Sequence, residues 1–190
     1  MTDSDDELLR AAANGDRDAF AALYRRRRPD VYRFALHMTG SAAAAEDVAQ
    51  DVFMTVIQDA RKFVPGRASV VAWLLGIARN HARRRLSERT LSPLEEAGDA
   101  RAAGDDPGVL LSNARELEWL RSALRALPVV YREAIVLCDL QELSYEDAAV
   151  AAGCAIGTVR SRLHRGRTLL AASIRGGRRA FARPQAVGWI

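Results

Sequence analysis

The sequence predicts an all-α protein of two small helical domains joined by a flexible acidic linker, the second domain ending in a helix-turn-helix. Apolar residues recur every three to four positions almost throughout, and no segment alternates over the length of a strand. Between 88 and 108 the net charge falls to −4, and prolines and glycines interrupt any helix. A chain of 190 residues, 49% hydrophobic, can build one domain or two small ones with a real core.

Four helices are expected in the first domain, residues 1–87. The first covers 5–14, and the second runs from Asp16 to Thr39-Gly40 with a kink at Pro29. The third begins at Ser41, and the fourth runs from 70 to about 86. A loop at 61–69 precedes the last of them. The start and stop signals between the first three are Asn14-Gly15, Asp16, Thr39-Gly40 and Ser41.

The linker is expected over 88–112, the second domain over 113–174, and a basic tail over 175–190. Within the second domain, helices are predicted over 113–127, 129–140, 148–152 and 157–174. Pro128 stops the first of these. Ser144 and Asp147 form a capping box before the third, which Gly153 ends.

Charge is unevenly distributed along the chain. There are 27 arginines, one lysine and 24 acids, giving a net charge of +4 and a pI of about 9.6. Residues 61–85 carry seven basic residues and residues 156–190 carry eight arginines, and neither segment contains an acidic residue. The rest of the chain therefore has a net charge of −11. Arginine favours phosphates and guanine edges, although a GC-rich genome also enriches it. Two basic segments on an otherwise acidic chain indicate nucleic-acid surfaces beside a surface for protein.

Several classes of protein are not supported. Cys138 and Cys154 are too few for a disulfide framework or a zinc site and sit among apolar residues as small hydrophobes. The acidic N-terminus carries no signal peptide, and no apolar run spans a bilayer, so a cytoplasmic location without membrane contact is expected. The three histidines lack metal-ligand spacing, and no nucleophile or phosphate loop is recognisable, so neither an enzyme nor a cofactor or metal is expected.

The last predicted helix is the strongest local candidate for DNA binding. Val159, Leu163 and Leu170 form an inward stripe, whereas hydroxyls and arginines occupy the other side. Such a helix, following a short helix and a glycine-containing turn, suits the major groove, where arginine can bind guanine in two hydrogen bonds. The outward and flanking residues are Thr158, Arg160, Ser161, Arg162, His164, Arg165 and Arg167.

The basic stretch 61–85 is a second candidate. Its loop and helix combine bases with Phe63 and Trp73, a composition suited to single-stranded DNA. Trp73 fits the core better, next to Leu74 and Ile77, whereas Asn80 and the loop fit a functional role. A third feature is the acidic face of Glu46, Asp47, Gln50 and Asp51, which is equally consistent with solvent and with a protein interface.

Three motifs carry a family resemblance. Residues 45–53 (AEDVAQDVF), 73–80 (WLLGIARN), and 127–128 (LP) with 157–167 (GTVRSRLHRGR) occur in this order. Together with the size and the two-domain layout, they resemble a bacterial RNA polymerase sigma factor of the extracytoplasmic-function (ECF) type. The resemblance extends from about Asp6 to Leu170.

The resemblance implies a role for each candidate surface. The face with Asp47, Gln50 and Asp51, followed by Phe53, would bind the clamp helices of the largest subunit of core RNA polymerase. The loop before the Trp73 helix would accept a flipped base of the −10 promoter element, beside Asn80. The residues implied or expected at the −10 element are Lys62, Phe63, Val64, Gly66, Arg67, Arg79, Asn80 and Arg83.

The helix-turn-helix would bind the −35 element, although His164 stands where the family often has an aromatic or aliphatic residue. Many relatives are held inactive by an anti-sigma factor. The chain is therefore expected to bind core RNA polymerase and promoter DNA and to direct transcription initiation without catalysis of its own. A stand-alone helix-turn-helix regulator is the alternative, and the second basic segment at 61–85 speaks against it.

Overall fold

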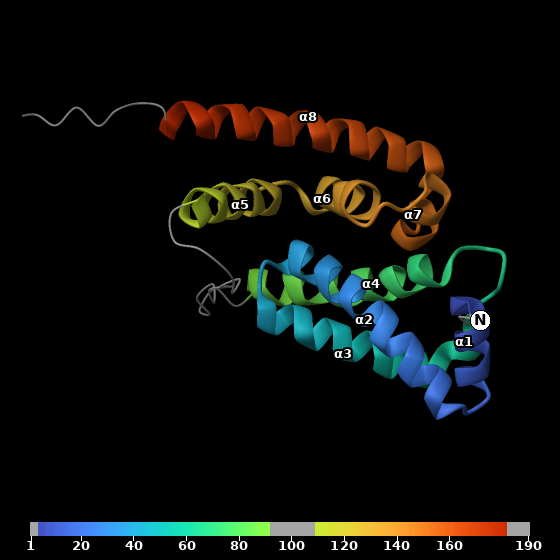
Figure 1. The fold of residues 1–190 in the computed structure, drawn as a ribbon. Helices are drawn as coiled ribbons and strands as arrows, with labels where there is room; N and C mark the ends of the chain where they lie inside the picture. The colour runs from blue at the N-terminus through green and yellow to red at the C-terminus, as the bar shows by residue number, and fades with distance from the viewer. Residues whose placement is uncertain (1–3, 92–108, 182–190) are drawn as a thin grey trace, which may run out of the picture.

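The computed structural model describes residues 4–91 and 109–181, and all regular structure in these ranges is helical. Figure 1 shows two helical bodies stacked on one another, α1–α4 and α5–α8. The α-helices are α1 (Asp5–Ala13), α2 (Arg17–Thr39), α3 (Ala42–Asp59), α4 (Val70–Leu91), α5 (Val109–Arg125), α6 (Val129–Ile135), α7 (Tyr145–Ala152) and α8 (Ile156–Phe181). A 3₁₀ turn, η1 (Ala60–Lys62), follows α3, and a π-helical segment, η2 (Val136–Leu140), continues α6.

Helix boundaries follow local capping. Asp16 accepts hydrogen bonds from the backbone N–H groups of Asp18 and Ala19 at 2.9 and 3.0 Å, and Gly40 ends α2 with φ 72°. Both caps confirm the predicted signals, whereas α2 continues without a break through the exposed Pro29. Ser4 and Glu7 form a capping box at α1 that the sequence analysis did not identify.

Helices α4, α5, α7 and α8 are longer than predicted, with α5 beginning at Val109 and α7 at Tyr145. Helix α4 continues past 86 to Leu91 because the first breaker is Pro93, and an Arg84–Glu88 ion pair of 2.9 Å supports its last turns. Helix α8 continues past 174 to Phe181, so the start of the expected tail is helical. The expected linker, 88–112, contains the last residues of α4 and the first residues of α5. Its middle, 92–108, lies outside the described residues, and so does the end of the expected tail, 182–190.

The two bodies share one apolar core. Buried side chains of α2, α3 and α4, such as Phe34, Val52 and Leu74, belong to the same cluster as Leu137 and Val159 of the second body. In Figure 1, α5, α6 and α7 lie between α8 and the first body, so α8 is on the far side of the molecule from α4. Helix α7 packs on α4, and α6 packs on α8. None of the described helices combines the length and apolar character needed to cross a bilayer.

Candidate nucleic-acid interface

Helices α7 and α8 form the predicted helix-turn-helix. Ser144 caps α7 by accepting a hydrogen bond from the backbone N–H of Asp147 at 3.0 Å, and Gly153 ends α7 in the left-handed region with φ 61°. Helix α8 then crosses α6 closely at the buried Gly166, where a Cβ atom would lie 3.1 Å from the carbonyl oxygen of Tyr131. The glycine therefore sets the distance between the second-domain core and the outward face of α8.

Most of the predicted −35 residues are exposed on α8. Arg160, Ser161, His164, Arg165 and Arg167 are exposed, and Thr158 is half-buried. The inward stripe is confirmed, with Val159 and Leu163 buried at 2% exposure.

Two of these arginines are held by neighbouring side chains. The Arg160 guanidinium carbon lies 5.3 Å from the centre of the Tyr145 ring, within the range of a cation–π contact. Arg167 donates two hydrogen bonds to Asp139, at 3.0 and 2.5 Å, and this carboxylate raises the pKa of Arg167. Both side chains are therefore positioned before any DNA is bound.

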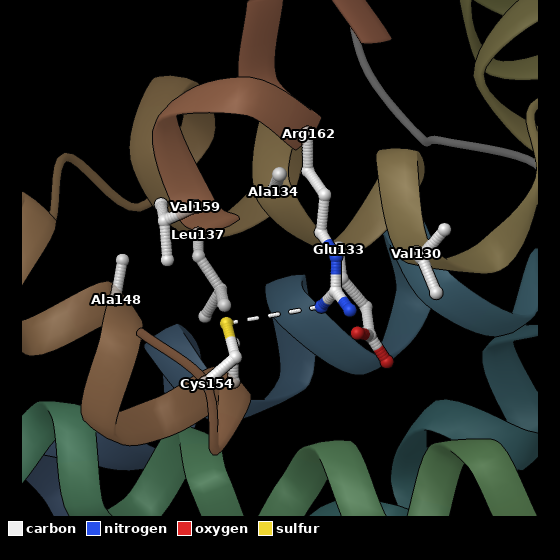
Figure 2. A pocket seen from close by; sticks show the side chains of 9 residues that line it. Val130, Glu133, Ala134, Leu137, Ala148, Cys154, Val159 and Arg162 are labelled. Atoms are coloured by element: carbon white, nitrogen blue, oxygen red, sulfur yellow. Dashed lines mark hydrogen bonds between the residues drawn. The ribbon is translucent and has the colours of Figure 1, made fainter. Parts of the chain in front are cut away.

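Arg162 does not lie where the pattern predicted. Its side chain is half-buried and donates a long 3.8 Å hydrogen bond to the sulfur of Cys154. Figure 2 shows Arg162 extending from α8 into a small pocket that Cys154 and Glu133 also line. The cavity measures about 10 Å³, roughly the room needed for one water molecule. In this conformation Arg162 faces the protein interior and is not available to a base.

The loop before α4 presents an exposed surface with one aromatic anchor. Lys62, Val64, Gly66 and Arg67 are exposed, and Gly66 adopts φ 81°, which only glycine tolerates readily. Phe63 is half-buried, and its ring centre lies 5.6 Å from that of Trp73. Trp73 is half-buried against the core, which supports its predicted structural role.

The predicted −10 residues on α4 divide into two groups. Asn80 is exposed. Arg83 donates to both carboxylate oxygens of Glu133, the Nη2–Oε2 distance being 3.0 Å, and Arg79 Nε lies 3.2 Å from Oε2. Glu133 belongs to α6 of the other domain and is 1% exposed. The structure thus joins two expected DNA-binding arginines to a carboxylate that the sequence analysis did not single out.

The outer face of α3 carries the predicted protein-binding residues. Asp47 and Gln50 are exposed and Asp51 is half-exposed, with Asp47 and Asp51 paired to Arg85 at 2.9 and 3.1 Å. Phe53 is different, because it is 3% exposed and its ring contacts Tyr24 edge-on at 4.7 Å. Phe53 therefore supports α3 from within the core, and its prediction as a contact residue is wrong for this structure.

Two apolar residues extend this outer face. Met54 and Ile57 are 50% and 61% exposed, and their helical spacing from Gln50 places them on the same side of α3. Neither side chain is among the binding residues predicted from the sequence. A helix that is buried on one side and exposes large apolar side chains beside carboxylates on the other has the character of a protein-binding surface.

Both cysteines are free thiols, and Cys138 shows no reactive character. Burial, with a smaller contribution from Asp139, raises the pKa of the Cys138 thiol from 9.0 to about 11. Cys154 is a half-buried free thiol. Within the described ranges, 4–91 and 109–181, no group of three or more histidine, cysteine or acidic side chains could hold a metal ion.

Comparison with known proteins identifies the family of this fold. Residues 23–91 match the sequence profile of Sigma-70 region 2, and residues 117–170 match that of Sigma-70 region 4. The chain is a sigma factor, and its 35% identity to two ECF sigma factors places it in the ECF family. As such, it directs core RNA polymerase to promoters. The two matched regions coincide with the two helical bodies, region 2 with most of α2–α4 and region 4 with α5–α8.

Similar proteins and structures agree with this assignment. The ECF sigma factor SigE of Mycolicibacterium smegmatis is 35% identical over 83% of this chain and 63% of its own length. EcfG of Rhodopseudomonas palustris is 35% identical over 76% of this chain and 78% of its own length. The sigma factor RpoE of Bartonella quintana, solved with the anti-sigma factor NepR, superposes with a TM-score of 0.66 at 31% identity, covering 82% of this chain and 96% of that one.

Another similar structure is that of CnrH in complex with the cytosolic domain of CnrY. It gives a TM-score of 0.71 at 26% identity and covers 92% of this chain and 99% of that one. The likeness therefore includes both helical bodies of the sigma factor.

Proposed function

We propose that this sigma factor binds core RNA polymerase through the outer face of α3, the −10 element through the 63–69 loop and α4, and the −35 element through α8. The observation that carries the proposal is the outer face of α3, where Asp47 and Gln50 lie beside the exposed Met54 and Ile57. A helix-turn-helix regulator acting alone needs no such surface in addition to two basic segments.

At the polymerase, Met54 and Ile57 would supply the apolar centre of the contact, and Asp47 and Gln50 its polar rim. This arrangement follows the usual anatomy of protein interfaces, in which a few central apolar side chains contribute most of the binding energy. The proposed partner surface is the pair of clamp helices of the largest polymerase subunit.

At the −10 element, the exposed loop would hold an unpaired base next to Asn80. Unstacking a base costs a few kcal/mol, which contacts to the flipped base and to the strand would offset. Arg67 in this loop and Lys62 just before it are exposed and would contact phosphates. Arg79 and Arg83 become available to the strand once they leave Glu133.

At the −35 element, Arg160 and Arg165 would bind base edges in the major groove, with Ser161 and His164 between them. Arg167, held by Asp139, would lie toward the phosphate backbone. Anchored arginines lose less conformational freedom on binding, which favours a defined register on the duplex.

The proposed mechanism consists of binding steps alone, so the sigma factor contributes no catalytic group. Because its partners are polymerase and promoter DNA, the proposed place of action is the bacterial cytoplasm. RpoE of Bartonella quintana was solved with an anti-sigma factor, and we propose that this sigma factor too has an anti-sigma partner.

Reconstitution with core RNA polymerase tests the proposal. We expect promoter-specific transcripts from the wild-type sigma factor with core enzyme. The double variant Asp47→Ala with Gln50→Ala should bind core about two- to tenfold more weakly, because it removes a charge and an amide from the polar rim of the interface. Affinity for core is measured by fluorescence anisotropy of the labelled sigma factor.

The control is Asp18→Ala, which removes an exposed carboxylate from the first turn of α2. It should bind core like the wild type. Equal affinity of the double variant and the wild type would exclude the α3 interface, and specific DNA binding without transcripts on adding core would favour a stand-alone regulator instead.

A further inference from the structure

Helix α4 presents one face to the second domain, and this face is the one that carries the basic −10 residues. Ser69, Ala72, Gly76, Arg79 and Arg83 recur at helical spacing along it. At Gly76 the two domains come close, since an added Cβ would lie 3.5 Å from the Cα of Ala151 in α7. A Cβ at this distance would make an ordinary van der Waals contact, so the backbones of α4 and α7 pack closely here.

Polar contacts hold both ends of this face. At the start of α4, Asp147 accepts hydrogen bonds from the backbone N–H and the hydroxyl of Ser69, at 3.0 and 2.7 Å. Further along, Glu133 accepts from Arg83 and lies beside Arg79. Both carboxylates come from the second domain, and their three partners, Ser69, Arg79 and Arg83, come from the first.

Asp147 departs from its local pattern. The spacing after Ser144 predicts that its carboxylate turns back to cap α7, yet the carboxylate crosses to the first domain. A capping group used across a domain interface indicates that this interface has a role of its own.

Glu133 shows what the contact does to the arginines. A carboxylate at 1% exposure is costly unless it is paired, and the cations beside it are the two arginines expected to meet DNA. In this arrangement the Arg79 side chain is only 15% exposed, so a DNA strand cannot reach its guanidinium. The buried Nε of Arg79 also makes no well-aligned hydrogen bond, so the contact between Arg79 and Glu133 rests on charge attraction alone.

We propose that the basic face of α4 has a second binding partner, the second domain of the same chain. Glu133 and Asp147 dock on this face and compete with single-stranded DNA. In the free sigma factor Arg79 and Arg83 are thereby held away from the strand, while Asn80 and the loop before α4 stay exposed. Helix α8 lies on the opposite side of the second domain and remains accessible in this docked form (Figure 1). The inference rests on the proposed function, because it assumes that α4 is a DNA-binding surface.

The test uses the full chain and two variants on the second-domain side, Glu133→Gln and Asp147→Asn, so that α4 itself is unchanged. Each removes one docking carboxylate and keeps the shape of the side chain. The matched control is Glu146→Gln, which removes an exposed carboxylate next to Asp147 on the same helix. The probe is a fluorescein-labelled, random-sequence single-stranded oligonucleotide of about 12 nucleotides, and the variants are also compared by small-angle X-ray scattering.

We expect both variants to bind the oligonucleotide at least about threefold more tightly than the wild type and to show a larger radius of gyration, while Glu146→Gln matches the wild type. Circular dichroism verifies folding, and Asp147→Asn carries the test if Glu133→Gln does not fold. Unchanged affinity in the folded variants would overturn the proposal, as would an equal gain in Glu146→Gln, since loss of any negative charge would then explain the effect.

A failure of the proposed function gives a different result. The wild type would then produce no promoter-specific transcripts with core polymerase, whereas the expansion of the variants in scattering would persist. The two hypotheses are therefore separated by the transcription assay and the scattering measurement.

Discussion

Two arginines on α8 differ in what their side chains contact. Arg165 is exposed on the outward face, whereas Arg162, three residues before it, turns inward to Cys154. The apolar stripe of α8 does not distinguish them, because it predicts only that neither belongs to the core. The direction of a long side chain depends on the pocket it can reach, and that pocket is formed by residues from three helices.

The difference leads to a prediction for −35 recognition. Arg165→Ala should reduce discrimination between the native −35 element and its point variants by about 1–3 kcal/mol, as expected for loss of an arginine that binds a base in two hydrogen bonds. Arg162→Ala removes the same charge from an inward position and should change discrimination much less. Binding of reconstituted holoenzyme to a promoter that it transcribes, and to that promoter with single −35 changes, measures both effects.

A uniform loss on all sequences in the Arg165 variant would instead place this residue on a phosphate. A loss in Arg162→Ala as large as that in Arg165→Ala would show that Arg162 turns outward on DNA.

At the scale of elements, the crossing of α6 and α8 depends on Gly166. A Cβ at this position would lie 3.1 Å from both the Tyr131 carbonyl oxygen and the Ile135 side chain. Gly166→Ala should therefore push α8 away from α6 and lower the free energy of unfolding by about 1–3 kcal/mol, a typical cost of overpacking. Urea denaturation followed by circular dichroism measures the change.

The matched control for this crossing is Gly157→Ala, near the start of the same helix. No atom lies within 4 Å of a Cβ added there, so the substitution should be neutral or slightly stabilising because alanine favours helix. If both alanine variants had the stability of the wild type, the close crossing would not limit the packing of α8.

Helix existence and helix starts were largely predictable from the sequence. Asp16, Ser41 and Ser144 act as caps where their patterns place them, because a cap acts within four residues of the chain. The ends of α4 and α8 were not, because no proline stands between the predicted and the observed end of either helix, and where a helix then ends depends on contacts made elsewhere. The π-helical segment η2 likewise has no local signal.

At the scale of the whole molecule, local charge was a poor guide to what each base contacts. The segment 61–85 has no acid of its own, yet Arg83, Arg84 and Arg85 all have acidic partners in space. The uneven distribution of bases and acids along the chain could be read from the sequence. The pairing of Arg79 and Arg83 with the other domain could not, because Glu133 is 50 positions away from Arg83 along the chain.

The junction of the two domains also contains a titratable histidine. His37, in the last turns of α2, has its pKa lowered from 6.5 by burial and by the nearby charges of Arg121 on α5 and Arg33 on α2. The unfolded chain therefore binds a proton on this histidine more readily than the folded protein does just below pH 6.5. The free energy of unfolding should fall as the pH drops through this range.

Denaturation in urea at about pH 7.5 and about pH 5.5 measures this dependence. His37→Gln, which carries no titrating ring, should lose the part of the slope that this histidine contributes. A variant with the same pH dependence as the wild type would assign the effect to other groups.

The contacts of Glu133 and Asp147 also restrict how halves of such proteins can be recombined. A chimaera that joined α1–α4 of this chain to the second domain of a paralogue would keep Arg79, Arg83 and Ser69 but replace the carboxylates that meet them. Each half could fold while the joint between them was mismatched. Residues on the two sides of this joint are therefore expected to vary together among related sigma factors. Exchange of second domains to change promoter specificity should work best between sigma factors that share these residue pairs.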